Sequence, residues 1–155
     1  MLVIVICRTD VIFVLDESGS VGRQDFDSLK SFVSQLAATL DIDSGDTRLG
    51  LLTYSTDVRH QFDLNTHSSL AAVPSAIASI SYAGGFTATG SALQYVRESM
   101  LQPAAGDRSS VPNVVVVFTD GYSNRPNSTH VEVSRLYTGV CHFTAECILD
   151  CSSCC

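Results

Sequence analysis

The sequence has little positive charge. Nine lysine and arginine residues face sixteen aspartate and glutamate residues, the formal net charge is -7, and Lys30 is the only lysine. Nucleic acids and anionic lipid surfaces are bound mainly through clustered cationic side chains. The apolar stretch that begins at Met1 ends at Cys7 and is far too short to span a bilayer. We therefore expect neither a nucleic-acid partner nor membrane insertion.

Several sequence signatures of enzymes are also missing. The chain contains no G-x-x-x-x-G-K-[ST] and no G-x-G-x-x-G for nucleotide phosphates, and no G-x-S-x-G nucleophile elbow. A phosphatase that forms an aspartyl-phosphate would need a second aspartate two residues after Asp16, and Ser18 stands there. Because no nucleophile is paired with a base, we expect a protein without catalytic activity.

The cysteines are unevenly distributed. One lies near the start and the others crowd the end: Cys7, Cys141, Cys147, Cys151, Cys154 and Cys155. An even number favours disulfides in an oxidising compartment. A zinc site at Cys151 and Cys154 with His142 is the alternative, but such sites usually need two well-spaced ligand pairs. Disulfides or free thiols are therefore favoured. No convincing signal peptide is recognisable.

The distribution of apolar residues predicts an α/β fold. Residues 11–15 and 114–118 are continuous apolar runs rich in β-branched side chains, typical of strands buried on both faces of a parallel sheet. Residues 48–54 and 58–64, joined by a short link, predict an antiparallel hairpin at a sheet edge. Strands that alternate with helices indicate an open, mostly parallel, doubly wound (Rossmann-like) sheet with one antiparallel edge strand and helices on both faces.

Apolar spacings of three and four predict the helices. They cover residues 26–40, 70–80 and 92–101. Pro74 is expected to delay the start of the second helix or to kink it. A short fourth helix is predicted over 130–138, with a capping box from Thr129 to Glu132 and Gly139 as the C-terminal cap.

Acids and hydroxyls follow two of the predicted strands. Asp16 and Asp120 each come directly after or close after an apolar run, so both reach the same edge of a parallel sheet. Ser18 and Ser20 alternate after Asp16 and point the same way in an extended turn. Such oxygen ligands suit Mg²⁺, Mn²⁺ or Ca²⁺. Taken alone, residues 16–20 fit a simple turn or helix cap about as well as a metal site.

Three motifs together resemble the von Willebrand factor A domain, of the matrix type found in matrilins and non-fibrillar collagens. They are DVIFVLDESGSVG at 10–22, YAGGFTATGSAL at 82–93 and VVVVFTDGYSN at 114–124. The resemblance covers about residues 7–144 and implies a metal-ion-dependent adhesion site (MIDAS). Its ligands would be Asp16, Ser18, Ser20, Thr87 and Asp120. Gly19, Gly84 and Gly85 would let the backbones approach the site without a Cβ in the way.

The resemblance implies a secreted adhesion module. It would hold Mg²⁺ or Mn²⁺, with Ca²⁺ as a further candidate, and through the ion an Asp or Glu side chain of collagen or another extracellular matrix or cell-surface protein. An alternative is a structural module that self-associates within a matrix protein, with the metal mainly stabilising it. Intracellular relatives in ATP-dependent assemblies form a third class, which the cysteines disfavour.

The end of the chain departs from the family pattern. After Val140 we expect a last strand and a closing helix to be missing, with residues 145–155 forming a cysteine-rich tail. Cys7 stands where matrix-type relatives often have a cysteine that pairs with one beyond the last helix, and it is a candidate for a disulfide. Asn127 begins the sequon Asn-Ser-Thr in a predicted surface loop, which is consistent with secretion and glycosylation.

Overall fold

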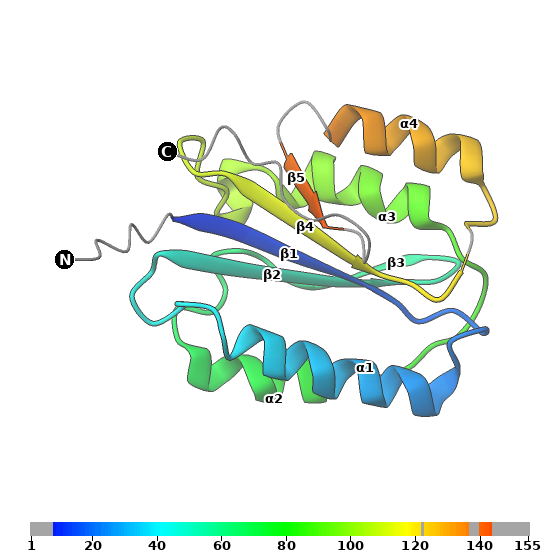
Figure 1. Ribbon diagram of the computed structural model, residues 1–155, viewed down its shortest axis with the longest axis horizontal. Helices are drawn as coiled ribbons and strands as arrows, with labels where there is room; N and C mark the ends of the chain where they lie inside the picture. The colour runs from blue at the N-terminus through cyan, green and yellow to red at the C-terminus, as the bar shows by residue number, and fades with distance from the viewer. Residues whose placement is uncertain (1–7, 122, 137–139, 144–155) are drawn as a thin grey trace.

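A computed structural model describes residues 8–121, 123–136 and 140–143, which form one mixed sheet with helices on both sides (Figure 1). The strand order is β3-β2-β1-β4-β5. All neighbouring pairs are parallel except β2 and β3, so the predicted antiparallel edge hairpin is confirmed. The strands are β1 (Thr9–Asp16), β2 (Thr47–Tyr54), β3 (Val58–Phe62), β4 (Asn113–Phe118) and β5 (Val140–Phe143).

Helices α1 and α2 lie on one face of the sheet, and α3 and α4 on the other (Figure 1). None of the helices in the described ranges is long and apolar enough to cross a membrane. The helices are α1 (Gly22–Ala37), a 3₁₀ turn (Leu70–Ala72) leading into α2 (Val73–Ala78), α3 (Thr89–Tyr95) continued by a π-helical turn (Val96–Met100), a 3₁₀ turn (Pro103–Ala105), and α4 (Pro126–Leu136).

Strand β1 is the centre of two apolar cores. Phe13 and Leu15 pack with α1 and α2, whereas Ile12 and Val14 pack with α3 and the turn that follows it. Successive strand residues point to opposite faces, so a strand between two helical layers is apolar at every position. Burial of β1 on both faces, as predicted from its continuous apolar run, is confirmed.

The same prediction is wrong for β4. Only Val115 is fully buried, and the remaining residues of the strand are partly exposed. Val116 and Phe118 pack against the core beside α1, and Val117 against the other core, so the run contacts both layers. Its neighbour β5 pairs with β4 from Asn113 to Val116, and no other strand of the described residues lies beside Val117 and Phe118 on that side. Apolar sequence therefore indicates contact with two layers but does not guarantee complete burial.

The predicted start of the last helix is also wrong. Helix α4 begins at Pro126, a favoured first residue because proline has no N–H to leave unpaired, so Thr129 lies inside the helix. The Thr129 hydroxyl donates to the Arg125 carbonyl (3.2 Å) and does not cap the helix. The sequon at Asn127 therefore lies in the first turn of a helix and not in a loop, although Asn127 itself is exposed.

The other helix boundaries differ by a few residues. Helix α1 begins four residues earlier than predicted, at Gly22, and ends before Leu40. Helix α2 begins late, with Pro74 in its first turn, as predicted. Predictions for Cys7, for Gly139 and for the cysteine-rich tail at 145–155 concern positions outside the described residues, and the division into 7–144 and 145–155 stays an expectation.

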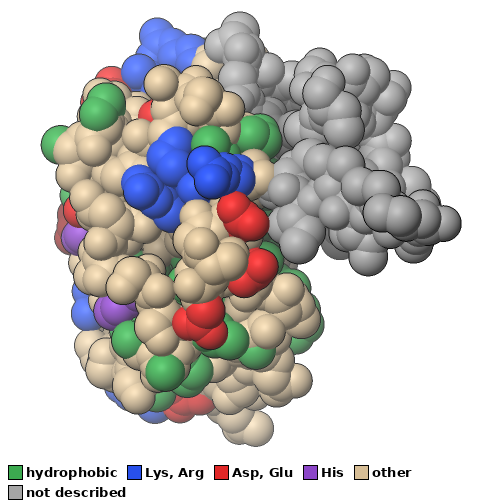
Figure 2. Space-filling model, turned by 90° about the vertical axis from the view of Figure 1, so that its left-hand side faces the viewer, with side chains coloured by type: hydrophobic (Ala, Val, Ile, Leu, Met, Phe, Trp, Pro, Cys, Tyr) green, Lys and Arg blue, Asp and Glu red, His purple; other side chains and the backbone are tan. Residues whose placement is uncertain are grey.

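At the amino ends of the parallel strands, basic and acidic side chains lie next to one another (Figure 2). Asp10 is completely buried there, at 0% exposure. The Arg108 guanidinium contacts one Asp10 carboxylate oxygen at 2.7 and 2.9 Å, and the Arg108 backbone N–H donates to the other at 2.9 Å. The same guanidinium donates to the carbonyls of Thr9, Gly45 and Asp46. One arginine thus joins the start of β1 to two loops.

Candidate functional site

The candidate site is built on Asp16, the last residue of β1. Its side chain is fully buried, and both carboxylate oxygens accept hydrogen bonds. Oδ1 accepts the Ser18 backbone N–H (2.8 Å), and Oδ2 accepts the hydroxyls of Thr119 (2.7 Å) and Tyr54 (3.4 Å). Three donors from three segments therefore hold this carboxylate in one orientation.

A chain of polar contacts runs from Asp16 to Asp120. The hydroxyls of Ser18 and Ser20 lie 3.0 Å apart, and the Ser20 hydroxyl donates to Asp120 Oδ1 at 3.1 Å. Ser18 is buried, whereas Ser20 and Asp120 are exposed, so the cluster opens to solvent. The parallel register of β1 and β4, with Leu15 beside Phe118, places the two turns at the same edge of the sheet. Four of the five predicted ligands are thus brought together.

Thr87, the fifth predicted ligand, reaches this edge through backbone contacts. The Gly19 N–H donates to the Gly85 carbonyl (2.9 Å), which joins the serine turn to the loop before α3. The Thr87 N–H donates to the Asn124 side chain (2.5 Å), and the Asn124 N–H donates back to the Thr87 carbonyl (2.9 Å). Within the described residues the Thr87 hydroxyl makes no hydrogen bond to the other four predicted ligands.

The glycines of this edge differ in what they require. Gly84 and Gly85 have positive φ values of 74° and 117°, which L-residues with a Cβ rarely adopt. A Cβ at Gly85 would also stand 2.6 Å from the Thr56 hydroxyl oxygen. A Cβ at Gly19 would stand 3.4 Å from the Gly85 carbonyl oxygen, an ordinary contact. The backbone conformation therefore favours glycine at 84 and 85, the Cβ position is obstructed at 85, and at 19 a Cβ would make only an ordinary contact.

Sequence reasoning gave no role to Glu17, which turns out to be a structural centre of the site. Its side chain is fully buried and accepts hydrogen bonds from Arg59 (2.9 and 3.1 Å), the Thr53 hydroxyl (3.0 Å) and the Ala83 N–H (3.1 Å). Asp16 and Glu17 thus point to opposite sides of the chain. The second acid fixes the loop before Gly84 against the hairpin, which helps to position Thr87.

Three further residues support the predicted ligands and were also missed. Thr119 and Tyr54 donate to Asp16, and Asn124 holds Thr87. Burial raises the pKa of Tyr54 to about 12, and the nearby Asp16 charge adds to the effect, whereas hydrogen bonds with Thr89 and Thr119 oppose it. A signal existed for Thr119 and Asn124, which both lie in the motif at 114–124. None existed for Tyr54, whose hydroxyl reaches the site only through the folded sheet.

The raised pKa of Tyr54 predicts a loss of stability at high pH. The hydroxyl ionises near pH 10 in the unfolded chain and near 12 in the folded domain, so the folded state holds its proton more tightly. Stability from this group is complete below pH 10 and falls between pH 10 and 12, by roughly 2 to 3 kcal/mol. Urea unfolding across this range should show the decline, and Tyr54→Phe should flatten it. An equal decline in the variant would assign the effect to other groups.

The donor set limits the chemistry of the site. Carboxylate and hydroxyl oxygens are hard ligands that suit Mg²⁺, Mn²⁺ and Ca²⁺ better than softer metals. Across the described ranges, no group of three or more His, Cys, Asp or Glu side chains is placed to hold a metal ion. A cation here would therefore depend on hydroxyls in addition to carboxylates.

Fold and site together define an open α/β domain with a polar cluster at the carboxyl edge of its sheet. Residues 10–141 match the model of the von Willebrand factor type A domain, and the chain belongs to this family. The resemblance that the three motifs indicated is thereby confirmed.

Curated relatives of this chain include a matrilin, vitrin and a collagen chain. Matrilin-1 of Mus musculus is 38% identical over 136 residues, which cover 84% of this chain and 27% of that protein. Vitrin of Bos taurus is 35% identical over 130 residues, covering 84% and 20%. Collagen alpha-1(XII) chain of Notophthalmus viridescens is 34% identical over 116 residues, covering 75% and 12%. The chain thus spans only a small part of each relative.

Solved structures confirm the fold. Proximal thread matrix protein 1 of the mussel byssus superposes with a TM-score of 0.82 and 25% identity, covering 88% of this chain and 36% of that one. A further structure of that protein, at 24% identity and the same TM-score, is described as having a zinc-occupied MIDAS motif. At 24% identity this further structure supports only the likeness of the fold, and the zinc ion is a property of that protein.

Proposed function

We propose that this domain is a cation-dependent adhesion module. Its divalent ion would be held by Asp16, Ser18, Ser20, Thr87 and Asp120, and a carboxylate of an extracellular protein would complete the coordination. The observation that carries the proposal is the continuous contact of Ser18, Ser20 and Asp120 at an edge open to solvent. Serine hydroxyls and a carboxylate gathered in this way offer several oxygen ligands to one ion.

The division of roles follows from burial. Asp16 already accepts three hydrogen bonds, so it orients the turn and neutralises part of the charge, while Ser18, Ser20 and Thr87 offer neutral hydroxyl oxygens. A bound ion surrounded mainly by neutral ligands keeps much of its positive charge and attracts an anionic side chain. Mg²⁺ or Mn²⁺ fits such a small cluster, with Ca²⁺ as the alternative.

The relatives support the kind of partner. They include collagen chains, a matrilin and vitrin, so we propose an extracellular location and a partner such as collagen or another matrix protein that presents Asp or Glu. We propose no catalytic role, because holding an ion that binds a partner's carboxylate accounts for the residues of the cluster. Self-assembly within a matrix protein is the competing function, and it predicts oligomers that need no acidic ligand.

Binding of the ion is tested with Asp120→Asn. Asp120 is exposed and accepts only one hydrogen bond in the described structure, so this change should leave the fold intact. Free Mg²⁺ at one hundred times its Kd should stabilise the wild type by about 2.7 kcal/mol in thermal unfolding. We expect Asp120→Asn to weaken Mg²⁺ binding by at least about tenfold. Asp57→Asn, at another exposed loop aspartate of the same edge, is the matched control.

Ligand binding is tested by capture on immobilised collagen and other matrix proteins in Mg²⁺ and in EDTA. The proposal expects capture that is lost in EDTA and with Asp120→Asn, but not with Asp57→Asn. Capture that persists unchanged under both conditions would contradict it. Size-exclusion chromatography with and without Mg²⁺ separates the competing function, which predicts oligomers without any captured ligand.

A further inference from the structure

An aromatic and a basic side chain flank the segment that holds Thr87. Phe86 directly precedes Thr87 and is 70% exposed, more than any other large apolar side chain in the described residues. Arg125 directly follows Asn124, which pairs with Thr87 through two hydrogen bonds. The Phe86 N–H donates to the Thr56 hydroxyl (3.0 Å), so the backbone that carries this ring is held in place. Aromatic side chains and arginine are enriched in the cores of protein–protein interfaces.

Among the lysine and arginine residues that the structure describes, Arg125 is the one whose side chain has no hydrogen bond, ion pair or ring contact. The others are engaged in hydrogen bonds, ion pairs or a ring contact: Arg8, Arg23, Lys30, Arg48, Arg59, Arg97, Arg108 and Arg135. In a chain with a net charge of -7, an arginine could readily find an acid. No acid among the described residues pairs with the Arg125 guanidinium, so beside the candidate ion site it offers a positive group to a partner.

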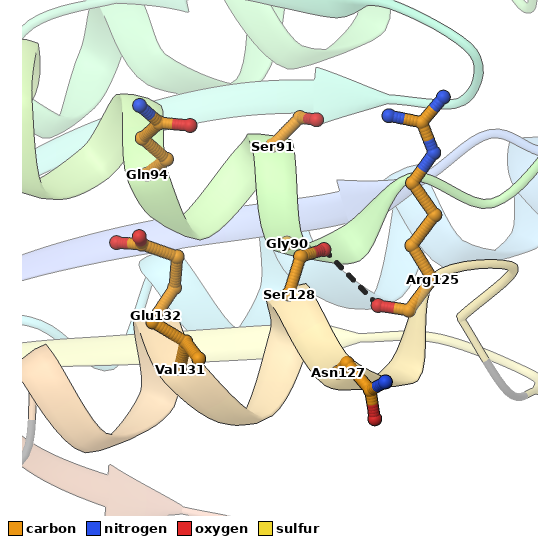
Figure 3. A pocket seen from close by; sticks show the side chains of 8 residues that line it. All are labelled: Gly90, Ser91, Gln94, Arg125, Asn127, Ser128, Val131 and Glu132. Carbon is orange, nitrogen blue, oxygen red and sulfur yellow. Dashed lines mark hydrogen bonds between the residues drawn. The ribbon is translucent and has the colours of Figure 1, made fainter.

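Two hollows meet at Arg125. One, of about 340 Å³, is lined by Phe86, Arg125, Thr56, Ala88, Ser91 and Asn124. The other, of about 400 Å³, lies between α3 and α4 and shares Ser91 and Arg125 with the first (Figure 3). The Arg125 guanidinium extends at the Ser91 end of this second hollow, away from Glu132 at its other end (Figure 3). Arg125 thus lines both hollows, and the Phe86 ring lines the first of them.

Glu132, which lines the second hollow, is not expected to repel an anionic partner. Glu132 pairs with Arg97 (2.9 Å) and Arg135 (2.7 Å). The hydrogen bond from Arg97 holds the pKa of Glu132 below its ordinary value, although burial of the carboxylate acts in the other direction. Its negative charge is thus compensated within the protein, and Arg125 sets the local charge of the open end.

We propose that Phe86 and Arg125 form a second recognition element, which selects an acidic, apolar segment of a partner protein. One carboxylate of that segment would reach the ion, a second acidic side chain would pair with Arg125, and a neighbouring apolar side chain would cover Phe86. This inference rests on the proposed function, since it places the partner at the cation site. Arginine suits a carboxylate because its planar fork donates two parallel hydrogen bonds.

The probe is a phage-displayed library of random linear peptides, selected on the wild-type protein in Mg²⁺ and eluted with EDTA. We expect enriched peptides with two acidic residues and an apolar neighbour. Arg125→Glu and Phe86→Ser should each weaken a selected peptide by about tenfold. The matched controls are Arg8→Glu, an exposed charge at the opposite edge, and Phe32→Ser, an exposed ring on α1. Both should bind the peptide as the wild type does.

A charge exchange gives the sharpest test. Replacing the second acid of a selected peptide by lysine should weaken its binding to the wild type. The same lysine peptide should bind the Arg125→Glu variant about as tightly as the original peptide binds the wild type. Peptides that EDTA elutes but that bind Arg125→Glu and Phe86→Ser as tightly as the wild type would overturn this inference and leave the cation-dependent function standing. Failure to select any peptide that EDTA elutes, together with no Mg²⁺ binding, would overturn both.

Discussion

Replacing Arg108 by methionine is expected to destabilise the folded domain by about 3 to 5 kcal/mol, the usual cost of leaving a buried charge without its partner. Asp10 is fully buried, and Arg108 supplies its counter-charge at 2.7 Å. The variant would leave this carboxylate with only the backbone N–H of position 108. It would also leave three backbone carbonyls without the guanidinium that they accept from.

Urea unfolding of the variant measures this loss, and two further variants make the result specific. Arg8→Met removes an exposed ion pair with Asp46, whose arginine side chain is 67% exposed, and should cost less than about 1 kcal/mol. Adding Asp10→Asn to Arg108→Met should recover part of the stability, because the unpaired buried charge is then gone. A double variant as unstable as Arg108→Met alone would show that packing, and not charge, explains the effect.

The second large effect is expected for Gly85→Ala. The backbone at this residue has a φ of 117°, and a Cβ would stand 2.6 Å from the Thr56 hydroxyl oxygen. Strain and contact together should cost about 1 to 3 kcal/mol of stability. The Gly85 carbonyl accepts the Gly19 N–H, so a displaced loop also moves Thr87 away from the serine turn. We therefore expect Mg²⁺ affinity to fall by about tenfold or more.

Two other glycines separate the causes of that effect. Gly22 has a φ of 73° and open space around its Cβ position, so Gly22→Ala carries backbone strain alone, at about 1 kcal/mol. Gly121 follows Asp120 and has neither a positive φ nor a neighbour within 4 Å, so Gly121→Ala should be close to neutral. Mg²⁺ titration by calorimetry should show normal affinity in both. A Gly85→Ala protein with normal affinity would contradict the expected link between this loop and the ion.

The predicted site could be located from the sequence because its parts lie at strand ends. Asp16 ends β1, and Asp120 follows β4 by two residues, so a parallel sheet alone brings them to one edge. Thr87 required the resemblance to a family, since it follows no strand. Its place depends on hydrogen bonds to Asn124 and on Gly85, which join three loops distant in sequence. Local patterns carry no information about such pairings.

The errors concern features that depend on neighbours. The continuous apolar run of β4 looks like that of β1, but β1 lies between two long strands, whereas in the part of the chain that the structure describes β4 has on its outer side only the short strand β5. The capping box at Thr129 was a sound local pattern, yet Pro126 begins the helix one turn earlier. In both cases the residue types are compatible with the prediction, but the observed burial and the observed helix start depend on neighbouring residues that the local pattern does not include.

The sequence by itself determined the alternation of strands and helices, the antiparallel edge hairpin and the position of Asp16 and Asp120 just after two strands. These follow from periodic burial of apolar side chains and from the position of polar residues just after strands. The tertiary structure alone decided that Glu17 faces Arg59 and Asp16 faces Tyr54 and Thr119, and that Phe86 and Arg125 line one hollow. The physical reason is that a buried charge must find partners from whichever segments the fold brings near, and those segments are far apart along the chain.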